Sequence, residues 1–84
     1  MNNNYNDPLI PVFIPALIVL LTNKENKKGS DLLESEVLEV RDNGSCIMMK
    51  ESKAIELDES RGYNDLDPEN CWEQWIEYKQ LNSQ

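Results

Sequence analysis

The chain has 84 residues, of which 39% are hydrophobic and 29% charged, and its formal net charge is −8. A chain of this length forms at most one small domain, and it buries only about 60–65% of the surface that its unfolded form exposes. This length excludes a dinucleotide-binding domain or a TIM barrel. The charge excludes a sequence-independent nucleic-acid binder, because such proteins need a basic surface.

The N-terminal part combines a polar tip with an apolar run. We predict a disordered tip at residues 1–7 and a single small helical domain at residues 8–84. Residues 8–21 carry no charge and include three prolines. Because proline is tolerated in the first turn of a helix and not in its interior, we predict an extended stretch to Ile14. A helix with Pro15 in its first turn then continues to the residue before Gly29.

The apolar run is too short for a membrane span, which takes about 20 helical residues. A small membrane-associated protein anchored by residues 8–21 is therefore an alternative and not our main prediction. Residues 16–21 have no polar face, so every side of this helix needs a cover. Either the helix lies at the centre of the core, or a second copy of the chain covers part of it. For the second case, the candidate self-association residues are Val12, Phe13, Leu17 and Leu20.

The next helix is predicted from hydrophobic periodicity. Apolar residues at i, i+4 and i+7 indicate an amphipathic helix over Leu32–Arg41. Either Ser30 or Asp31 can cap its first amides. Residues 42–44, Asp-Asn-Gly, are typical of a turn and end the helix.

Residues 45–60 allow two interpretations. One is a helical turn at Cys46–Met49 followed by a helix from Ser52 to Ser60, with Gly62 as its C-terminal stop. The other is a β-hairpin that pairs Cys46–Lys50 with Ala54–Asp58, since apolar and polar residues alternate there. We favour the helix because few residues of this region are β-branched.

The last helix has the clearest start signal. Asp67 is a good N-cap, Pro68 suits the first helical position, and Glu69 complements the helix dipole. A stripe of apolar residues then runs to Leu81. The fold class predicted for the whole chain is all-α, a small bundle of three to four short helices, with the hairpin around residues 46–58 as the open alternative.

Catalytic and metal-binding patterns are missing from the sequence. There is no histidine, and the two cysteines, Cys46 and Cys71, are too few for a zinc site or a disulfide framework. We expect both to be reduced and partly buried. No phosphate-binding glycine loop and no nucleophile elbow is present. We therefore expect a protein that is not an enzyme and needs no cofactor.

The negative charge is concentrated in the second half of the chain. Residues 1–50 carry seven acids and five bases, whereas residues 51–84 carry nine acids and three bases. Aromatic side chains lie among these acids, and tryptophan rimmed by carboxylates is typical of a binding hot spot. Arg61 is expected to pair with Asp58 or Asp65, or to anchor an interface. The candidate partner-binding residues are Glu56, Asp58, Glu59, Arg61, Tyr63, Asp65, Asp67, Glu69, Trp72, Glu73, Trp75 and Glu77.

These observations predict a protein–protein interaction module in the cytoplasm that binds a basic protein rather than nucleic acid. In size, charge and helix count the chain resembles small acidic inhibitors, namely bacterial immunity proteins that neutralise toxins and phage proteins that block host defences. The first resemblance implies an immunity-type inhibitor that occupies the basic surface of a toxin, a nuclease or another nucleic-acid-processing protein. The second implies an anti-defence inhibitor that imitates nucleic-acid charge. A homodimer is compatible with both.

Overall fold

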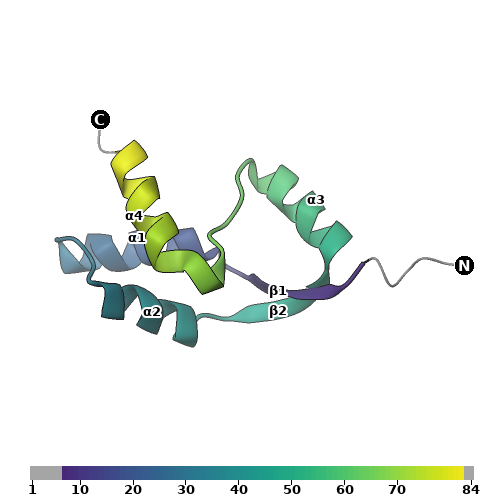
Figure 1. Cartoon of the computed structure of the whole chain (residues 1–84), viewed down its shortest axis with the longest axis horizontal. Helices are drawn as coiled ribbons and strands as arrows, with labels where there is room; N and C mark the ends of the chain where they lie inside the picture. The colour runs from purple at the N-terminus through teal and green to yellow at the C-terminus, as the bar shows by residue number, and fades with distance from the viewer. Residues whose placement is uncertain (1–6, 83–84) are drawn as a thin grey trace, which may run out of the picture.

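The computed structural model describes residues 7–82 of the chain. Within that range the chain is mostly helical, with four α-helices and one two-stranded antiparallel sheet (Figure 1). The predicted disorder at residues 1–6 lies outside the described residues. In chain order the elements are β1 (Leu9–Phe13), α1 (Leu17–Lys28), α2 (Glu34–Asn43), β2 (Cys46–Lys50), α3 (Glu51–Arg61), a short 3-10 helix (Pro68–Asn70) and α4 (Cys71–Leu81).

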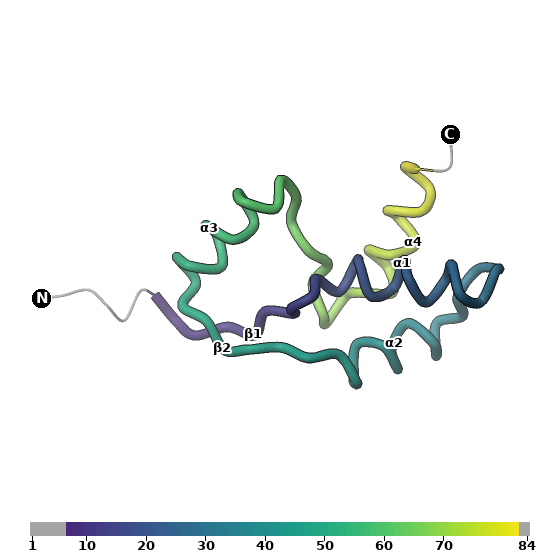
Figure 2. The backbone as a smooth tube through the Cα atoms, turned by 180° about the vertical axis from the view of Figure 1, so that it is seen from behind, coloured from purple at the N-terminus to yellow at the C-terminus, as the bar shows by residue number. Residues whose placement is uncertain are grey.

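The molecule is elongated. Helices α1, α2 and α4 gather at one end, and the sheet extends from them to carry α3 at the other (Figures 1 and 2). The described chain measures 52 × 27 × 18 Å, and its radius of gyration is 14.4 Å. A compact chain of this length has a radius of gyration of about 12 Å. No helix within the described range is long and apolar enough to cross a membrane.

The hydrophobic core lies between α1, α2 and α4. Apolar side chains from these helices meet there with Phe13 from the end of β1 and Leu66 from the segment before α4. Helix α3 contributes little, since Ala54 is its one buried residue. The core members are Phe13, Leu17, Leu21, Leu32, Val37, Leu66, Cys71 and Trp75.

The two strands pair over their full length, with Leu9 opposite Lys50 and Phe13 opposite Cys46. Both interpretations of Cys46–Lys50 were therefore wrong in part. This segment is a strand, as the hairpin alternative required, but its partner is the N-terminal extended stretch and not Ala54–Asp58. The latter segment belongs to α3, as the favoured helix predicted, and Gly62 ends α3 in the left-handed conformation at φ 82°.

Helix α1 ends where the sequence predicts, whereas both ends of α2 are shifted. Helix α1 ends at Gly29, which adopts φ 78° and donates its backbone N–H to the carbonyl of Glu25. Its start differs, because Pro15 lies before the helix and Ala16 occupies the N-cap position. Helix α2 begins two residues later than predicted and ends two residues later.

The cap of α2 also differs from the prediction, and α3 has a cap that the sequence did not indicate. Neither Ser30 nor Asp31 caps α2; instead the Glu36 carboxylate accepts the Leu33 N–H at 2.7 Å. In α3, the N–H and hydroxyl of Ser52 both donate to the Asp7 carboxylate at 2.8 Å. Asp7, predicted to be part of a disordered tip, thus holds the start of a helix 45 residues away.

Candidate functional site

Helix α4 carries the candidate site, and the capped 3-10 helix Pro68–Asn70 leads directly into it. The Asp67 carboxylate accepts the backbone N–H of Glu69 at 3.0 Å and the side-chain amide of Asn70 at 2.9 Å. Pro68 follows at the first position of this 3-10 helix, as its sequence signal predicted, but the helix predicted to continue from Asp67 is interrupted, and α4 itself begins at Cys71. The buried side chains of Cys71 and Trp75 then fasten the inner face of α4 to the core.

Three exposed acids lie along the final helical segment, one in the 3-10 helix and two in α4, and we call them the acidic stripe: Glu69, Glu73 and Glu77. Glu73 and Glu77 lie four residues apart on the helix, and Glu69 precedes them by one turn. All three are exposed, and none forms an ion pair with another residue in the range 7–82. Glu73 and Glu77 repel each other at this spacing by about 0.2–0.5 kcal/mol. Glu69 and Glu73 lie in the first turns of their helices, where the helix dipole favours an acid by a similar amount, so the stripe contributes little net stability to α4.

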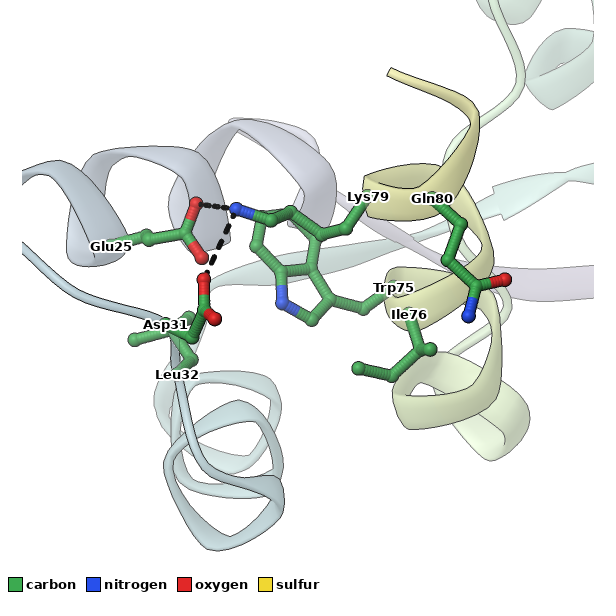
Figure 3. Close-up of a pocket in the computed structure, with 7 residues that line it drawn as sticks. All are labelled: Glu25, Asp31, Leu32, Trp75, Ile76, Lys79 and Gln80. Atoms are coloured by element: carbon green, nitrogen blue, oxygen red, sulfur yellow. Dashed lines mark hydrogen bonds and ion pairs between the residues drawn. The ribbon is translucent and has the colours of Figure 1, made fainter. Parts of the chain in front are cut away.

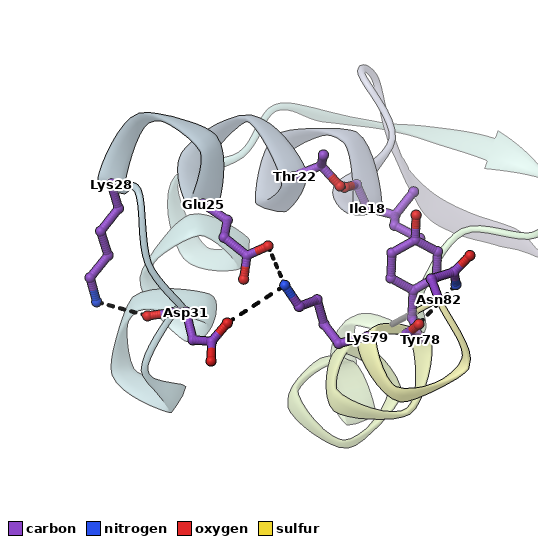
Figure 4. Close-up of polar contacts among 8 residues, drawn as sticks. All are labelled: Ile18, Thr22, Glu25, Lys28, Asp31, Tyr78, Lys79 and Asn82. Atoms are coloured by element: carbon purple, nitrogen blue, oxygen red, sulfur yellow. Dashed lines mark hydrogen bonds and ion pairs between the residues drawn. The ribbon is translucent and has the colours of Figure 1, made fainter. Parts of the chain in front are cut away.

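Lys79 is the one basic residue of α4, and it points away from the stripe. Its Nζ lies 2.5 Å from Glu25 Oε1 on α1 and 3.7 Å from Asp31 Oδ1 in the turn between α1 and α2 (Figures 3 and 4). The same ammonium lies 5.7 Å from the centre of the Trp75 ring. The hydrogen bond to Glu25 raises the pKa of Lys79 above its ordinary value. This lysine ties α4 to α1 and leaves the stripe unneutralised.

A shallow pocket of about 410 Å³ lies where α1, the turn after it and α4 meet (Figure 3). Two carboxylates there share the ammonium of Lys79, so the pocket has an excess of negative charge. The Oε2 atom of Glu25 is buried and has no hydrogen-bond partner among the described residues. Among those residues, no group of three or more cysteine, aspartate and glutamate side chains could hold a metal ion. The lining residues are Glu25, Asp31, Leu32, Trp75, Ile76, Lys79 and Gln80.

Two of the predicted partner-binding acids cap helices. Asp65 accepts the backbone N–H groups of Leu17 at 2.6 Å and Ile18 at 2.9 Å, and so caps α1. Asp67 caps the 3-10 helix before α4. Both carboxylates are committed to the fold, a role that their spacing in the sequence did not indicate.

Arg61 makes a contact that was not predicted. Its guanidinium donates to the backbone carbonyl of Phe13 at 2.9 Å, and the structure shows no ion pair to Asp58 or Asp65. The local-pairing expectation was therefore wrong. Arg61 joins α3 to the end of β1 instead.

The remaining acids do not form one surface with the stripe. Glu56, Asp58 and Glu59 lie on α3, at the end of the molecule away from α4 (Figure 1). The Oε1 atom of Glu56 lies 3.7 Å from the Nζ atom of Lys53 on the same helix. The predicted acidic face is thus divided between two separated helices.

The aromatic residues are divided between core and surface. Trp75 is 2% exposed and stacks on Tyr78 with the ring centres 5.8 Å apart, so a partner cannot reach it. Trp72 is half-buried and lies one helical turn before Ile76, which is also half-buried. These two side chains form an apolar row beside the acidic stripe. Tyr63 is 40% exposed and lines a second pocket, of about 450 Å³, against α1.

The proposed self-association residues are mostly inside the molecule. Phe13 is 7% exposed and Leu17 is fully buried, while Val12 and Leu20 are half-buried. The core of this chain therefore covers most of the apolar part of α1. Phe13 and Leu17 therefore offer little surface to a second copy, and self-association through Val12 and Leu20 stays a prediction.

Sequence reasoning missed Lys79 and Glu25, whose ion pair joins residues 54 positions apart. No local pattern signals such a pairing. Comparison with protein-family models, curated proteins and solved structures finds no match for this chain.

Proposed function

We propose that the chain is a non-enzymatic binding protein whose acidic stripe docks on a basic surface of a partner protein. The observation that carries this proposal is the stripe itself. Glu69, Glu73 and Glu77 are exposed and form no ion pair with any described residue, while the one base of α4 turns inward to Glu25. Exposed carboxylates that have no cation within residues 7–82 suit a basic group of a partner.

An apolar row beside the stripe supports the same face of α4. Trp72 and Ile76 are half-buried and lie four residues apart, directly preceding Glu73 and Glu77 in the sequence. A partner that meets the carboxylates therefore also covers apolar surface. Charged side chains would supply the rate and specificity of association, and the apolar row would supply burial.

In its most concrete form, the proposal is a cytoplasmic immunity-type inhibitor that covers the substrate groove of a toxin or nuclease. Such a groove must be positive to hold a nucleic acid or nucleotide, so it complements the stripe. An anti-defence inhibitor would use the same stripe on a different target. The two forms share the docking surface and differ in the identity of the partner.

The test starts by isolating a partner on the immobilised full chain and eluting it with salt. The double variant Glu73→Gln/Glu77→Gln should then lower the association rate with the purified partner on the order of 3- to 10-fold at low salt. Glu34→Gln/Glu39→Gln is the matched control, because it removes two exposed acids from α2. This control should leave the association rate near that of the unmodified chain.

Ionic strength provides the second arm. The Debye length falls from about 30 Å at 0.01 M salt to about 8 Å at 0.15 M, so an association steered by the stripe must slow across this range. An association rate that is indifferent to salt, or equally lowered by both double variants, would overturn the docking assignment.

A further inference from the structure

One edge of the sheet, along β2, is open among the described residues. No helix or strand of residues 7–82 lies beside β2 on the side away from β1 in either view (Figures 1 and 2). A two-stranded sheet is marginal in water, and an open strand edge is a template for further pairing.

The ladder shows which backbone groups face this open edge. Ile14 N–H donates to the Ser45 carbonyl at 3.1 Å, and Glu51 N–H donates to the Pro8 carbonyl at 2.9 Å. These two hydrogen-bonded pairs lie just beyond the two ends of the paired strands, in the same register. Hydrogen-bonded and non-hydrogen-bonded pairs alternate along an antiparallel ladder. The N–H and C=O groups of Cys46 and Met48 therefore point outward, and within residues 7–82 they have no partner.

The two edges of the sheet are not equivalent. On β1, Pro11 has no N–H to offer at an outward position, and Arg61 occupies the outward carbonyl of Phe13. Proline on an edge strand is a common protection against pairing. The β2 edge carries no such protection, so it is the edge that can accept a strand.

The side chains near this edge are apolar and exposed. Met48 is 59% exposed and Ile47 is 51% exposed, and Leu9 on the neighbouring strand is 61% exposed. Neither strand contains an acid, and the one charge in Leu9–Phe13 and Cys46–Lys50 is Lys50. In a chain with a net charge of −8, this is a surface on which two copies can meet without opposing carboxylates.

We propose that a second copy of this chain pairs antiparallel with β2, about a twofold axis at Met48. In this register the outward groups of Met48 meet those of Met48 in the second copy. Cys46 lies opposite Lys50, the N-cap residue of α3, so the Cys46 carbonyl meets the Lys50 N–H. The product is a continuous four-stranded sheet with β1 on each outer edge. A basic partner finds no carboxylate on either strand, so the second copy suits this edge better.

A cysteine cross-link tests the register in the full chain. Residues in a hydrogen-bonded antiparallel pair have Cα atoms about 5.5 Å apart, within the range that a disulfide spans. Lys50→Cys places a thiol opposite Cys46 of the second copy, and mild oxidation should yield a covalent dimer whose linked peptides contain positions 46 and 50. Lys53→Cys is the control, because it adds an exposed thiol on α3 that is not opposite Cys46. Equal cross-linking of the two variants would overturn the register.

Light scattering at about 100 μM tests the association itself. The unmodified chain should have twice the mass of one copy, and Met48→Lys should be monomeric with an unchanged circular dichroism spectrum, since two lysines would then oppose each other at the axis. Leu9→Lys, which adds the same charge to an equally exposed residue of β1, should remain dimeric. A monomeric unmodified chain, or a dimer that survives Met48→Lys, would overturn the proposal.

Discussion

Replacing Asp65 by alanine removes the cap of α1 without changing any residue of that helix. The Asp65 carboxylate accepts the first two amides of α1, from Leu17 and Ile18, and also accepts its neighbour Leu66 N–H at 2.8 Å. Ala16 at the N-cap position has no side-chain oxygen to replace it. Because Leu17 is fully buried, its amide has little access to water once the carboxylate is gone.

The expected cost combines two effects. Loss of an N-cap side chain destabilises a protein by about 0.5–2 kcal/mol, and a buried N–H left without an acceptor costs about 1–3 kcal/mol. We expect Asp65→Ala to lower the free energy of unfolding by about 2–4 kcal/mol. Domains of this size have a total stability of about 4–13 kcal/mol. The corresponding fall in Tm is about 10–25 °C.

Urea unfolding followed by tryptophan fluorescence measures this loss, because Trp75 is buried in the folded chain. Asp65→Asn keeps one acceptor oxygen and should cost about half as much. Glu59→Ala removes an exposed acid from α3 and should change the stability by less than about 0.5 kcal/mol. If Asp65→Ala costs no more than Glu59→Ala, the carboxylate does not cap α1 and the reasoning fails.

Three further predictions concern single sites. A Cβ at Gly44 would lie 2.8 Å from the Phe13 ring, so Gly44→Ala should destabilise the chain by about 1–3 kcal/mol through overpacking. An added Cβ at Gly62 meets no atom within 4 Å, so Gly62→Ala should cost about 1–2 kcal/mol from its positive φ alone. Urea unfolding measures both costs, and a Gly44→Ala chain as stable as the unmodified one would contradict the overpacking. Cys46 is exposed, contrary to prediction, whereas Cys71 is buried and its burial raises the pKa of its thiol. Iodoacetamide should therefore modify Cys46 in the folded chain and Cys71 only after unfolding. Rapid modification of both cysteines in the folded chain would contradict this. The N–H and hydroxyl of Ser52 lower the pKa of Asp7, so its contribution to stability is complete above the unfolded pKa of about 3.9 and is lost as the pH falls through the lower folded value. Ser52→Ala should raise the pKa of Asp7 part of the way to its ordinary value in a carboxyl NMR titration, and an unchanged titration would rule out the hydroxyl contact.

Local sequence signals determined where α1 and α3 end and where the final helical segment begins. Gly29 and Gly62 end α1 and α3 in the left-handed conformation, and Asp67 with Pro68 starts the final helical segment. Each signal acts through hydrogen bonds or backbone angles within a few residues, so it is readable without knowing the fold. The extended stretch before α1 follows from its prolines in the same way.

Only the tertiary structure decided the conformation of Cys46–Lys50 and the roles of the acids. That segment is a strand because Leu9–Phe13 pairs with it from far along the chain, and its own five residues carry no decisive period. Asp65 and Glu73 look alike in the sequence, yet Asp65 caps α1 and Glu73 faces outward from α4. The folded chain decides which carboxylate lies next to an unpaired amide. A hydrogen bond between segments nearly fifty residues apart leaves no pattern in the local sequence.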